Sequence, residues 1–377
     1  MKKFISLVIC CTLFFTLALT GCGNSTNTDS KENVAKDGTE STEEKLKIVL
    51  LIPGLLGDKS FFDSANHGLD MVKEELGAET KVIEMGIDKT KWQPTLLDVS
   101  EQDWDIVISG GWEMTEMLNE AAEQFTDKKY INFDTSDGET PDNLYAMFYK
   151  TNEVSFLAGA TAALVTTSDM PLVNPEKLIG FLGGMDNPGI NDFLVGYIEG
   201  AKYVEPEIKV AVSYVGDFAN PAKGKEMSIS QYNAGVDIGF NVAGMTGLGQ
   251  LDAAKEIDKY AIGVDSDQAL LFKDTDIEKS QHIVTSALKK IDASILRAVK
   301  KYQEGTLEFG KYEVLGFKEG GIGIAKNEFY NDLLNDEMKK KVEEIEAKLT
   351  NGEIEVKTAF GLDTDQINEI RNSVKPQ

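Results

Sequence analysis

Aromatic, acidic and glycine residues stand at or near the ends of several apolar segments of this sequence. They include Phe61, Trp112, Asp134, Phe240, Gly263 and Asp265. Aromatic faces stack on flat rings, carboxylates accept hydrogen bonds from hydroxyl and N–H groups, and glycine lets a ligand approach the backbone closely. Together these residue types suit a nucleoside or a sugar better than a phosphate.

The elements that must position these residues form a repeated pattern of a short apolar segment, a turn and an amphipathic helix. The predicted strands are residues 47–52, 81–85, 105–109, 130–133, 178–182, 208–215, 237–242, 260–264, 283–287 and 312–317. Helices are predicted at residues 60–76 and 114–125, and one long helix at residues 327–349 closes the chain. Such βα units predict two α/β lobes with parallel sheets, which bind ligands beyond the carboxyl ends of their strands.

The N-terminal segment carries a different kind of signal. Lys2 and Lys3 precede an apolar run over residues 4–19, which ends in Leu19-Thr20-Gly21-Cys22. This run is short for a membrane span and resembles a secretory signal that ends in a bacterial lipobox. It predicts a signal peptide at residues 1–21, lipidation of Cys22 and a disordered polar tether at residues 22–45. The protein would then be lipid-anchored on the extracytoplasmic face of the cell membrane; the alternative is a plain transmembrane anchor.

Composition excludes some classes of partner. The chain has 63 acidic and 38 basic side chains, a net charge of -25, so it lacks the basic surface that binding nucleic acid requires. Cys10 and Cys11 lie inside the predicted signal peptide, and Cys22 would carry lipid. The mature chain therefore cannot form a disulfide, and an ordinary hydrophobic core must hold the fold.

Enzyme chemistry has few of its usual parts here. His67 and His282 are the only histidines, and neither neighbours a nucleophile or a second metal ligand in the sequence. The glycines from Gly244 to Gly249 do not have the spacing of a dinucleotide-binding loop. We therefore expect no catalysis, no cofactor and no metal, although hydrolysis by a pair of carboxylates stays open because acids are abundant.

Seven segments resemble, in order, the basic membrane protein (BMP) family of bacterial lipoproteins, which includes purine-nucleoside receptors of ABC transporters. They are Asp58-Lys-Ser-Phe61, Ser155-Phe-Leu-Ala-Gly159, Gly180-Phe-Leu-Gly-Gly-Met185, Pro221-Ala-Lys-Gly-Lys225, Val242-Ala-Gly-Met-Thr-Gly-Leu-Gly249, Ile262-Gly-Val-Asp-Ser-Asp-Gln268 and Lys318-Glu-Gly-Gly-Ile-Gly323. The resemblance implies a type I periplasmic-binding-protein fold, with a nucleoside in the cleft between two doubly wound α/β lobes joined by crossing hinge strands. Its lobes would be residues 46–155 and 156–280, and residues 281–377 would supply hinge crossings and C-terminal elements. Separate ABC permease and ATPase subunits would be the partners.

The resemblance also implies a binding site. The base would lie between Phe61 and Phe240, with Asp134 at its edge. The backbone near Gly263, together with Asp292 and Lys318, would bind the ribose. Asp265 is a further candidate for the ribose, and Trp112 is another residue that could stack on a ring.

Each of these residues also has a structural explanation. Phe240 could be a core residue, Asp134 could cap a turn, and Asp292 stands near a helix start, where an acid is favoured without any ligand. The chain departs from the family pattern at Pro53 and Phe62, where many members carry polar residues. These departures leave open a different nucleoside or another ring-bearing solute, such as a sugar. A surface sensor or adhesion lipoprotein is a separate alternative.

Overall fold

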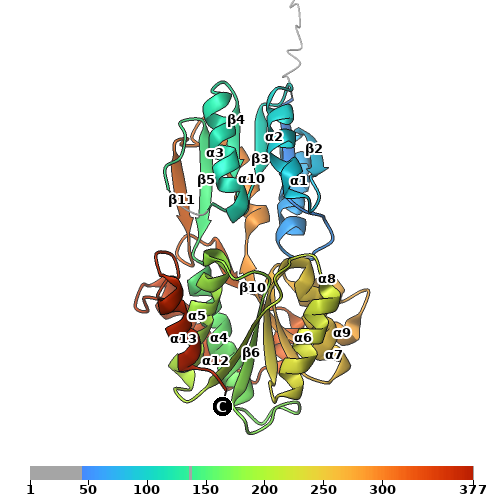
Figure 1. Cartoon of the computed structure of the whole chain (residues 1–377), viewed down its shortest axis with the longest axis vertical. Helices are drawn as coiled ribbons and strands as arrows, with labels where there is room; N and C mark the ends of the chain where they lie inside the picture. The colour runs from blue at the N-terminus through green and yellow to red at the C-terminus, as the bar shows by residue number, and fades with distance from the viewer. Residues whose placement is uncertain (1–44, 136–137, 377) are drawn as a thin grey trace, which may run out of the picture. The chain divides into compact units, whose positions relative to one another are not determined.

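The computed structural model describes residues 45–135 and 138–376, and from residue 45 onward they form one compact unit. Two six-stranded sheets organise this unit (Figure 1). The predicted signal peptide, Cys22 and all but the last residue of the predicted tether lie outside the described residues. Among the residues that are described, the model has no helix that is both long and apolar enough to cross a bilayer.

The first sheet is parallel throughout and has the strand order β11-β5-β4-β3-β1-β2. Its strands are β1 (Lys47–Ile52), β2 (Glu79–Glu84), β3 (Ile106–Ser109), β4 (Lys129–Asn132), β5 (Leu144–Tyr149) and β11 (Lys311–Leu315). Helices α1 (Phe61–Leu76), α2 (Trp92–Ser100), α3 (Thr115–Gln124) and α10 (Ile291–Gln303) belong to this lobe. Alternate residues of β1 enter different cores: Leu50 packs on the α1 side, whereas Leu51 packs with the residues of α2 and α3. Both faces are covered, which is why the central strands are apolar throughout.

The second sheet has the order β12-β10-β9-β8-β6-β7, and only β12 runs antiparallel. Its strands are β6 (Leu178–Gly183), β7 (Lys209–Tyr214), β8 (Ile238–Val242), β9 (Tyr260–Asp265), β10 (Ile283–Lys289) and β12 (Ile322–Ile324). The helices of this lobe are α4 (Thr151–Thr166), α5 (Pro188–Val204), α6 (Pro221–Asn233), α7 (Leu248–Glu256), α8 (Gln268–Phe272), α9 (Ile277–Ser280), α11 (Glu328–Leu333), α12 (Asp336–Thr350) and α13 (Thr364–Ser373). The predicted α/β fold with two parallel-dominated sheets is confirmed.

Three chain crossings join the lobes. The chain passes from β5 to α4 through Lys150, from β10 to α10 through Lys290, and from β11 to β12 through residues 316–321. Each lobe is therefore built from segments that lie far apart in the sequence. Because the crossings lie beside the carboxyl ends of β5 and β10, they also border the edge at which an open α/β sheet binds its ligand.

The C-terminal region differs from the sequence-based prediction. The single helix expected at residues 327–349 is two helices, α11 and α12, because Leu334 is extended and Asn335 caps α12 by accepting a hydrogen bond from the Met338 N–H at 2.9 Å. The long helix does not close the chain either, since α13 follows it. Strands β5 and β12 and helix α2 were not predicted.

Candidate ligand-binding site between the two lobes

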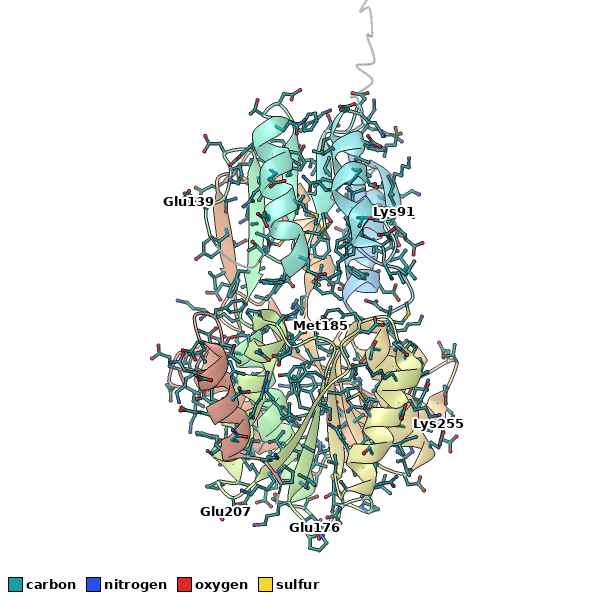
Figure 2. All side chains as sticks on the ribbon, viewed as in Figure 1. Lys91, Glu139, Glu176, Met185, Glu207 and Lys255 are labelled. Carbon is teal, nitrogen blue, oxygen red and sulfur yellow. The ribbon has the colours of Figure 1, made fainter. Side chains whose placement is uncertain are left out.

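A cavity of about 360 Å³ lies between the lobes. Its walls come from loops that follow the carboxyl ends of strands in both sheets. Phe61, Trp112 and Asp134 line it from the first lobe, and Phe218, Asp265 and Lys289 line it from the second. Met185, labelled in Figure 2 at the level where the two lobes meet, also lines the cavity. Four of the predicted site residues, Phe61, Trp112, Asp134 and Asp265, are thus brought together at one cavity.

A buried ammonium group of the second lobe bonds to a carboxylate of the first lobe inside this cavity. Lys289, the last residue of β10, donates a hydrogen bond to Asp134 Oδ2 at 3.0 Å, and only 6% of its side chain is exposed. Its Nζ lies 5.1 Å from the ring centre of Phe61, 5.4 Å from that of Phe193 and 5.6 Å from that of Tyr149. The rings hold the cation electrostatically. One N–H of the ammonium is directed to Asp134, and an ammonium has three donors, so it can also serve a ligand.

The charge of this ammonium acts on two carboxyl groups of the cavity, Asp134, which it bonds, and Asp265. Burial raises the pKa of Asp134, and the charge of Lys289 opposes that rise. Burial also raises the pKa of Asp265, opposed by Lys289 and by the hydrogen bond from Ser60. A buried ion pair contributes little net stability, because desolvation offsets much of the attraction. The clustering of perturbed carboxyl groups in a cavity is instead typical of a functional site.

Asp265 and its neighbour Gln268 also form hydrogen bonds between the two lobes at the cavity. Asp265 Oδ2 accepts a hydrogen bond from Ser60 Oγ at 2.6 Å, and Gln268 Nε2 donates to the Lys59 carbonyl at 3.1 Å. Lys59 and Asp265 both have left-handed backbone, with φ of 53° and 61°. Non-glycine residues adopt this conformation at a cost in free energy, and such strain clusters at ligand sites and switch regions.

Aromatic rings enter the cavity from each lobe. Phe61 is half-buried and packs against Phe133 and Phe62, with ring centres 5.5 and 5.2 Å away. Phe218, in the loop after β7, is half-buried and lies directly against Gly184, where any β-carbon would overlap its ring. Trp112 is 43% exposed at the rim. Phe61 and Phe218 therefore line the cavity from opposite lobes.

Asp58 shapes the loop that carries Phe61. Its carboxylate accepts hydrogen bonds from the backbone N–H groups of Ser60, Phe62 and Asp63 at 2.9 to 3.1 Å. Burial raises the pKa of Asp58 to about 6, and these three N–H groups oppose the rise. The side chain therefore holds the start of α1 in the conformation that directs Phe61 into the cavity.

Phe240 and Gly263 do not line the cavity. Phe240 lies at the middle of β8, is 0% exposed and packs among Phe181, Phe193 and Tyr197. Gly263 lies within β9, where a β-carbon would overlap the Ser286 hydroxyl. The structural explanation therefore holds for Phe240, a core residue, whereas Phe218 of the same lobe lines the cavity.

The predicted ribose-binding pair is not part of the cavity either. Asp292, in the first turn of α10, accepts a hydrogen bond from His67 Nδ1 at 3.0 Å, and Lys318 is exposed in the turn between β11 and β12. The combination expected of them, a carboxylate beside an ammonium, is supplied by Asp134 and Lys289 instead.

Sequence reasoning missed Lys289 and Phe218. The apolar pattern predicts a strand that ends at residue 287, two residues before β10 ends, so the pattern does not place Lys289 at a strand end. Phe218 lies four residues after the end of β7, so it satisfies the rule that ligand-binding residues follow the carboxyl ends of strands. Pro53 and Phe62, the two departures from the family pattern, both line the cavity.

The charges of the cavity disfavour an anionic ligand. Five carboxyl groups and two ammonium groups line it: Asp58, Glu113, Asp134, Asp217 and Asp265 against Lys89 and Lys289. A phosphate would meet this acidic excess in a partly desolvated site. Within residues 45–135 and 138–376, no group of three or more His, Cys, Asp or Glu side chains is placed to hold a metal ion.

Comparisons with known proteins agree with this architecture. The family model Bmp, described as ABC transporter substrate-binding protein PnrA-like, matches residues 45–359. Basic membrane protein A1 of Borrelia garinii subsp. bavariensis is 31% identical over 323 residues, which cover 84% of this chain and 90% of that protein. Basic membrane protein A of Borreliella burgdorferi is 32% identical over 312 residues, which cover 82% and 86%.

Among solved structures, a solute-binding protein of an ABC transporter system from Aeropyrum pernix K1 is similar. It has a TM-score of 0.76 and 25% sequence identity, and the match covers 87% of this chain and 98% of that one. This likeness confirms the predicted periplasmic-binding-protein fold. Because the family model extends over most of the chain, the protein belongs to the Bmp family of PnrA-like substrate-binding proteins of ABC transporters.

Proposed function

We propose that this protein binds a nucleoside, preferably a purine nucleoside, in the cavity between its lobes and delivers it to an ABC permease. The observation that carries the proposal is the Asp134–Lys289 pair, 3.0 Å apart, beside the ring of Phe61 in an interlobe cavity of about 360 Å³. A nucleoside offers one end rich in hydroxyl groups and one flat ring. The cavity offers partners for both.

The hydroxyl groups of the ribose suit the charged residues. A vicinal diol can donate to a carboxylate and accept from an ammonium, so Asp134, Asp265 and Lys289 can engage it from both sides. In this proposal Asp134 serves the sugar. The base then lies between Phe61 and Phe218, which belong to different lobes. Stacking of a base on aromatic rings contributes about 1–3 kcal/mol per base.

The apolar residues at Pro53 and Phe62 bear on which base is preferred. Both line the cavity in place of polar residues that could bond the edge of a base. A site without those hydrogen-bonding groups discriminates less among bases, because no buried polar partner is left unpaired by a wrong base. We therefore expect the preference for purine nucleosides to be modest.

Binding would be coupled to closure of the lobes. A ligand that touches both Phe61 and Phe218 makes its full set of contacts only when the lobes are together, so it shifts the population toward the closed form. The closed form would then be the one that docks on the permease. The membership of the chain in an ABC substrate-binding family supports delivery to a permease.

We propose further that Cys22 is lipidated after removal of residues 1–21 and that the protein is held at the extracytoplasmic membrane face. The sequence Leu19-Thr20-Gly21-Cys22 supports this proposal. Metabolic labelling with a radioactive fatty acid should label the wild-type protein but not Cys22→Ser. Equal labelling of both would refute the anchor without affecting the ligand proposal.

Thermal melting with a panel of compounds tests the ligand class. A ligand present at about 100 times its dissociation constant should stabilise the fold by about 2.7 kcal/mol. We expect such a shift with purine nucleosides and none with their monophosphates. A shift with hexoses or pentoses alone would replace the nucleoside by a sugar, and no shift with any compound would favour a sensor or adhesion role. Chromatography of each compound after incubation should show no conversion.

A further inference from the structure

The segment between α12 and α13 brings an unexpected aromatic residue to the cavity. This C-terminal segment, residues 351–363, contains no helix or strand, yet Phe360 lines the cavity and is half-buried. The family model ends at residue 359, so Phe360 stands just beyond the matched region. No feature of the segment's sequence had suggested a part in ligand binding.

Buried Asp192 on α5 fixes this segment in place. Its Oδ1 accepts hydrogen bonds from Thr358 Oγ1 at 2.6 Å and from the Ala359 N–H at 2.9 Å. Its Oδ2 accepts from Thr151 Oγ1 at 2.6 Å and from the Asn152 N–H at 3.0 Å. Asp192 is 1% exposed, so one desolvated carboxylate joins the C-terminal segment to the start of α4, directly after the first crossing between the lobes.

Further hydrogen bonds hold the residues that precede Phe360. Asn152 Nδ2 donates to the carbonyl groups of Val356 and Lys357 at 3.0 and 3.2 Å, and Glu199 accepts from the Lys357 N–H at 3.0 Å. These partners lie on α4 and α5, so two helices of the second lobe hold the segment. Phe360 is therefore held at the cavity by a prearranged support, which reduces the entropy lost when it meets a ligand.

Phe360 also meets the opposite lobe. Its ring centre lies 5.2 Å from that of Phe148, at an interplanar angle of 64°. Phe148 belongs to β5 and lines the cavity too. Tyr312 of β11 also packs against Phe148, with ring centres 6.5 Å apart, but Tyr312 does not line the cavity. The pair of Phe148 and Phe360 thus forms an aromatic wall built from both lobes.

We propose that Phe360 contacts the ligand and determines specificity, by limiting the size of the substituents that fit on the side of the cavity next to the first crossing. The proposal rests on the nucleoside function proposed above. Substituents that extend toward the wall of Phe148 and Phe360 would meet two fixed rings, and a packed apolar wall discriminates by about 10- to 200-fold per added group. An unsubstituted nucleoside would fit against the same wall.

The test is a calorimetric titration of the purified full-length chain and Phe360→Ala with three probes. These are adenosine, adenosine with a benzyl group on its exocyclic amine, and adenosine with a methylthio group in place of its primary hydroxyl. For adenosine, Phe360→Ala should bind about two- to tenfold more weakly, since one aromatic contact is lost. For at least one enlarged probe, the affinity relative to adenosine should rise by about tenfold or more in the variant.

Tyr312→Ala is the matched control, because it also removes an aromatic contact with Phe148 but leaves the cavity lining unchanged. It should keep the wild-type affinities for all three probes. The affinities of Phe360→Leu should lie between those of the wild type and those of Phe360→Ala. This variant replaces Phe360→Ala in the test if the alanine variant does not fold. If every Phe360 variant kept the wild-type ratio of affinities for the enlarged probes and adenosine, the proposal would be overturned while the nucleoside function stayed intact. Failure of the wild type to bind any nucleoside would overturn both.

Discussion

Lys289 Nζ lies 3.0 Å from Asp134 Oδ2, so an ammonium at the end of β10 in one lobe is paired with a carboxylate after β4 in the other. This contact lies inside the cavity and joins the two halves of the site. Each lobe supplies one of the two charged groups, so the pair forms only when the lobes are together. A ligand that engages both side chains is therefore sensitive to closure.

Replacing Lys289 should abolish tight binding. Lys289→Met removes the ammonium and leaves Asp134 and Asp265 without their cationic partner, which raises the pKa of both further. Truncating one partner of a buried charged pair costs about 2–4 kcal/mol in affinity, or about 30- to 700-fold. Isothermal titration with adenosine measures this loss. Lys290→Met is the control, since the adjacent lysine does not line the cavity; equal losses in the two variants would contradict the assignment.

Phe218 and Phe240 should respond differently to truncation. Phe218→Ala is expected to weaken adenosine binding by about 1–3 kcal/mol, because a half-buried stacking ring is lost. Phe240→Ala should instead lower the free energy of unfolding by about 3–5 kcal/mol, because this ring fills the core at 0% exposure.

Urea denaturation and calorimetry on both variants measure the two effects. The distinction between the rings requires that Phe218→Ala remain close to wild-type stability. If Phe240→Ala kept wild-type stability and lost only binding, the ring would have to be reassigned to the ligand site.

Asp58 should make stability depend on pH. Its pKa is about 6 in the folded protein and 3.8 ordinarily, so between about pH 4 and 6 the folded state holds a proton that the unfolded state releases. This group therefore contributes stability at low pH, and the contribution is lost as the pH rises through 6. The full difference corresponds to about 3 kcal/mol.

Urea denaturation at several pH values, compared between the wild type and Asp58→Asn, isolates this contribution. As the pH rises from about 4 to 6, the free energy of unfolding should fall less in the variant than in the wild type. Asp70→Asn, which changes an exposed carboxyl group on α1, the helix that follows Asp58, should retain the full fall in stability. Parallel curves for the wild type and Asp58→Asn would show that the carboxyl group of Asp58 does not titrate in this range.

Much of the fold could be predicted because the strands are short apolar segments bounded by turns. Residues of β1 such as Leu50 and Leu51 are buried on opposite faces, which is typical of a central parallel strand. The rule that ligands bind beyond the carboxyl ends of strands selects Phe61, Trp112, Asp134 and Asp265, and these four residues line one cavity. Local pattern and topology were sufficient for these residues.

Other residues depend on tertiary structure. Phe240 and Phe218 are both aromatic residues near the end of an apolar segment, and only the packing of α5 on β8 shows that Phe240 is core. Lys289 lies in β10 because pairing with β12 extends the strand beyond its apolar part. Phe360 reaches the cavity because its neighbours Thr358 and Ala359 donate hydrogen bonds to Asp192, which lies 166 and 167 residues away from them in the chain. None of these long-range relations is present in a local pattern.

A crystal structure of the protein soaked or co-crystallised with adenosine would test the central proposal most directly. We predict that the base lies between Phe61 and Phe218, that the ribose hydroxyl groups lie within hydrogen-bonding distance of Lys289 and of Asp134 or Asp265, and that Phe240 does not touch the ligand. A nucleoside bound outside the interlobe cavity would contradict the proposal, as would a cavity in which the charged residues face no hydroxyl group.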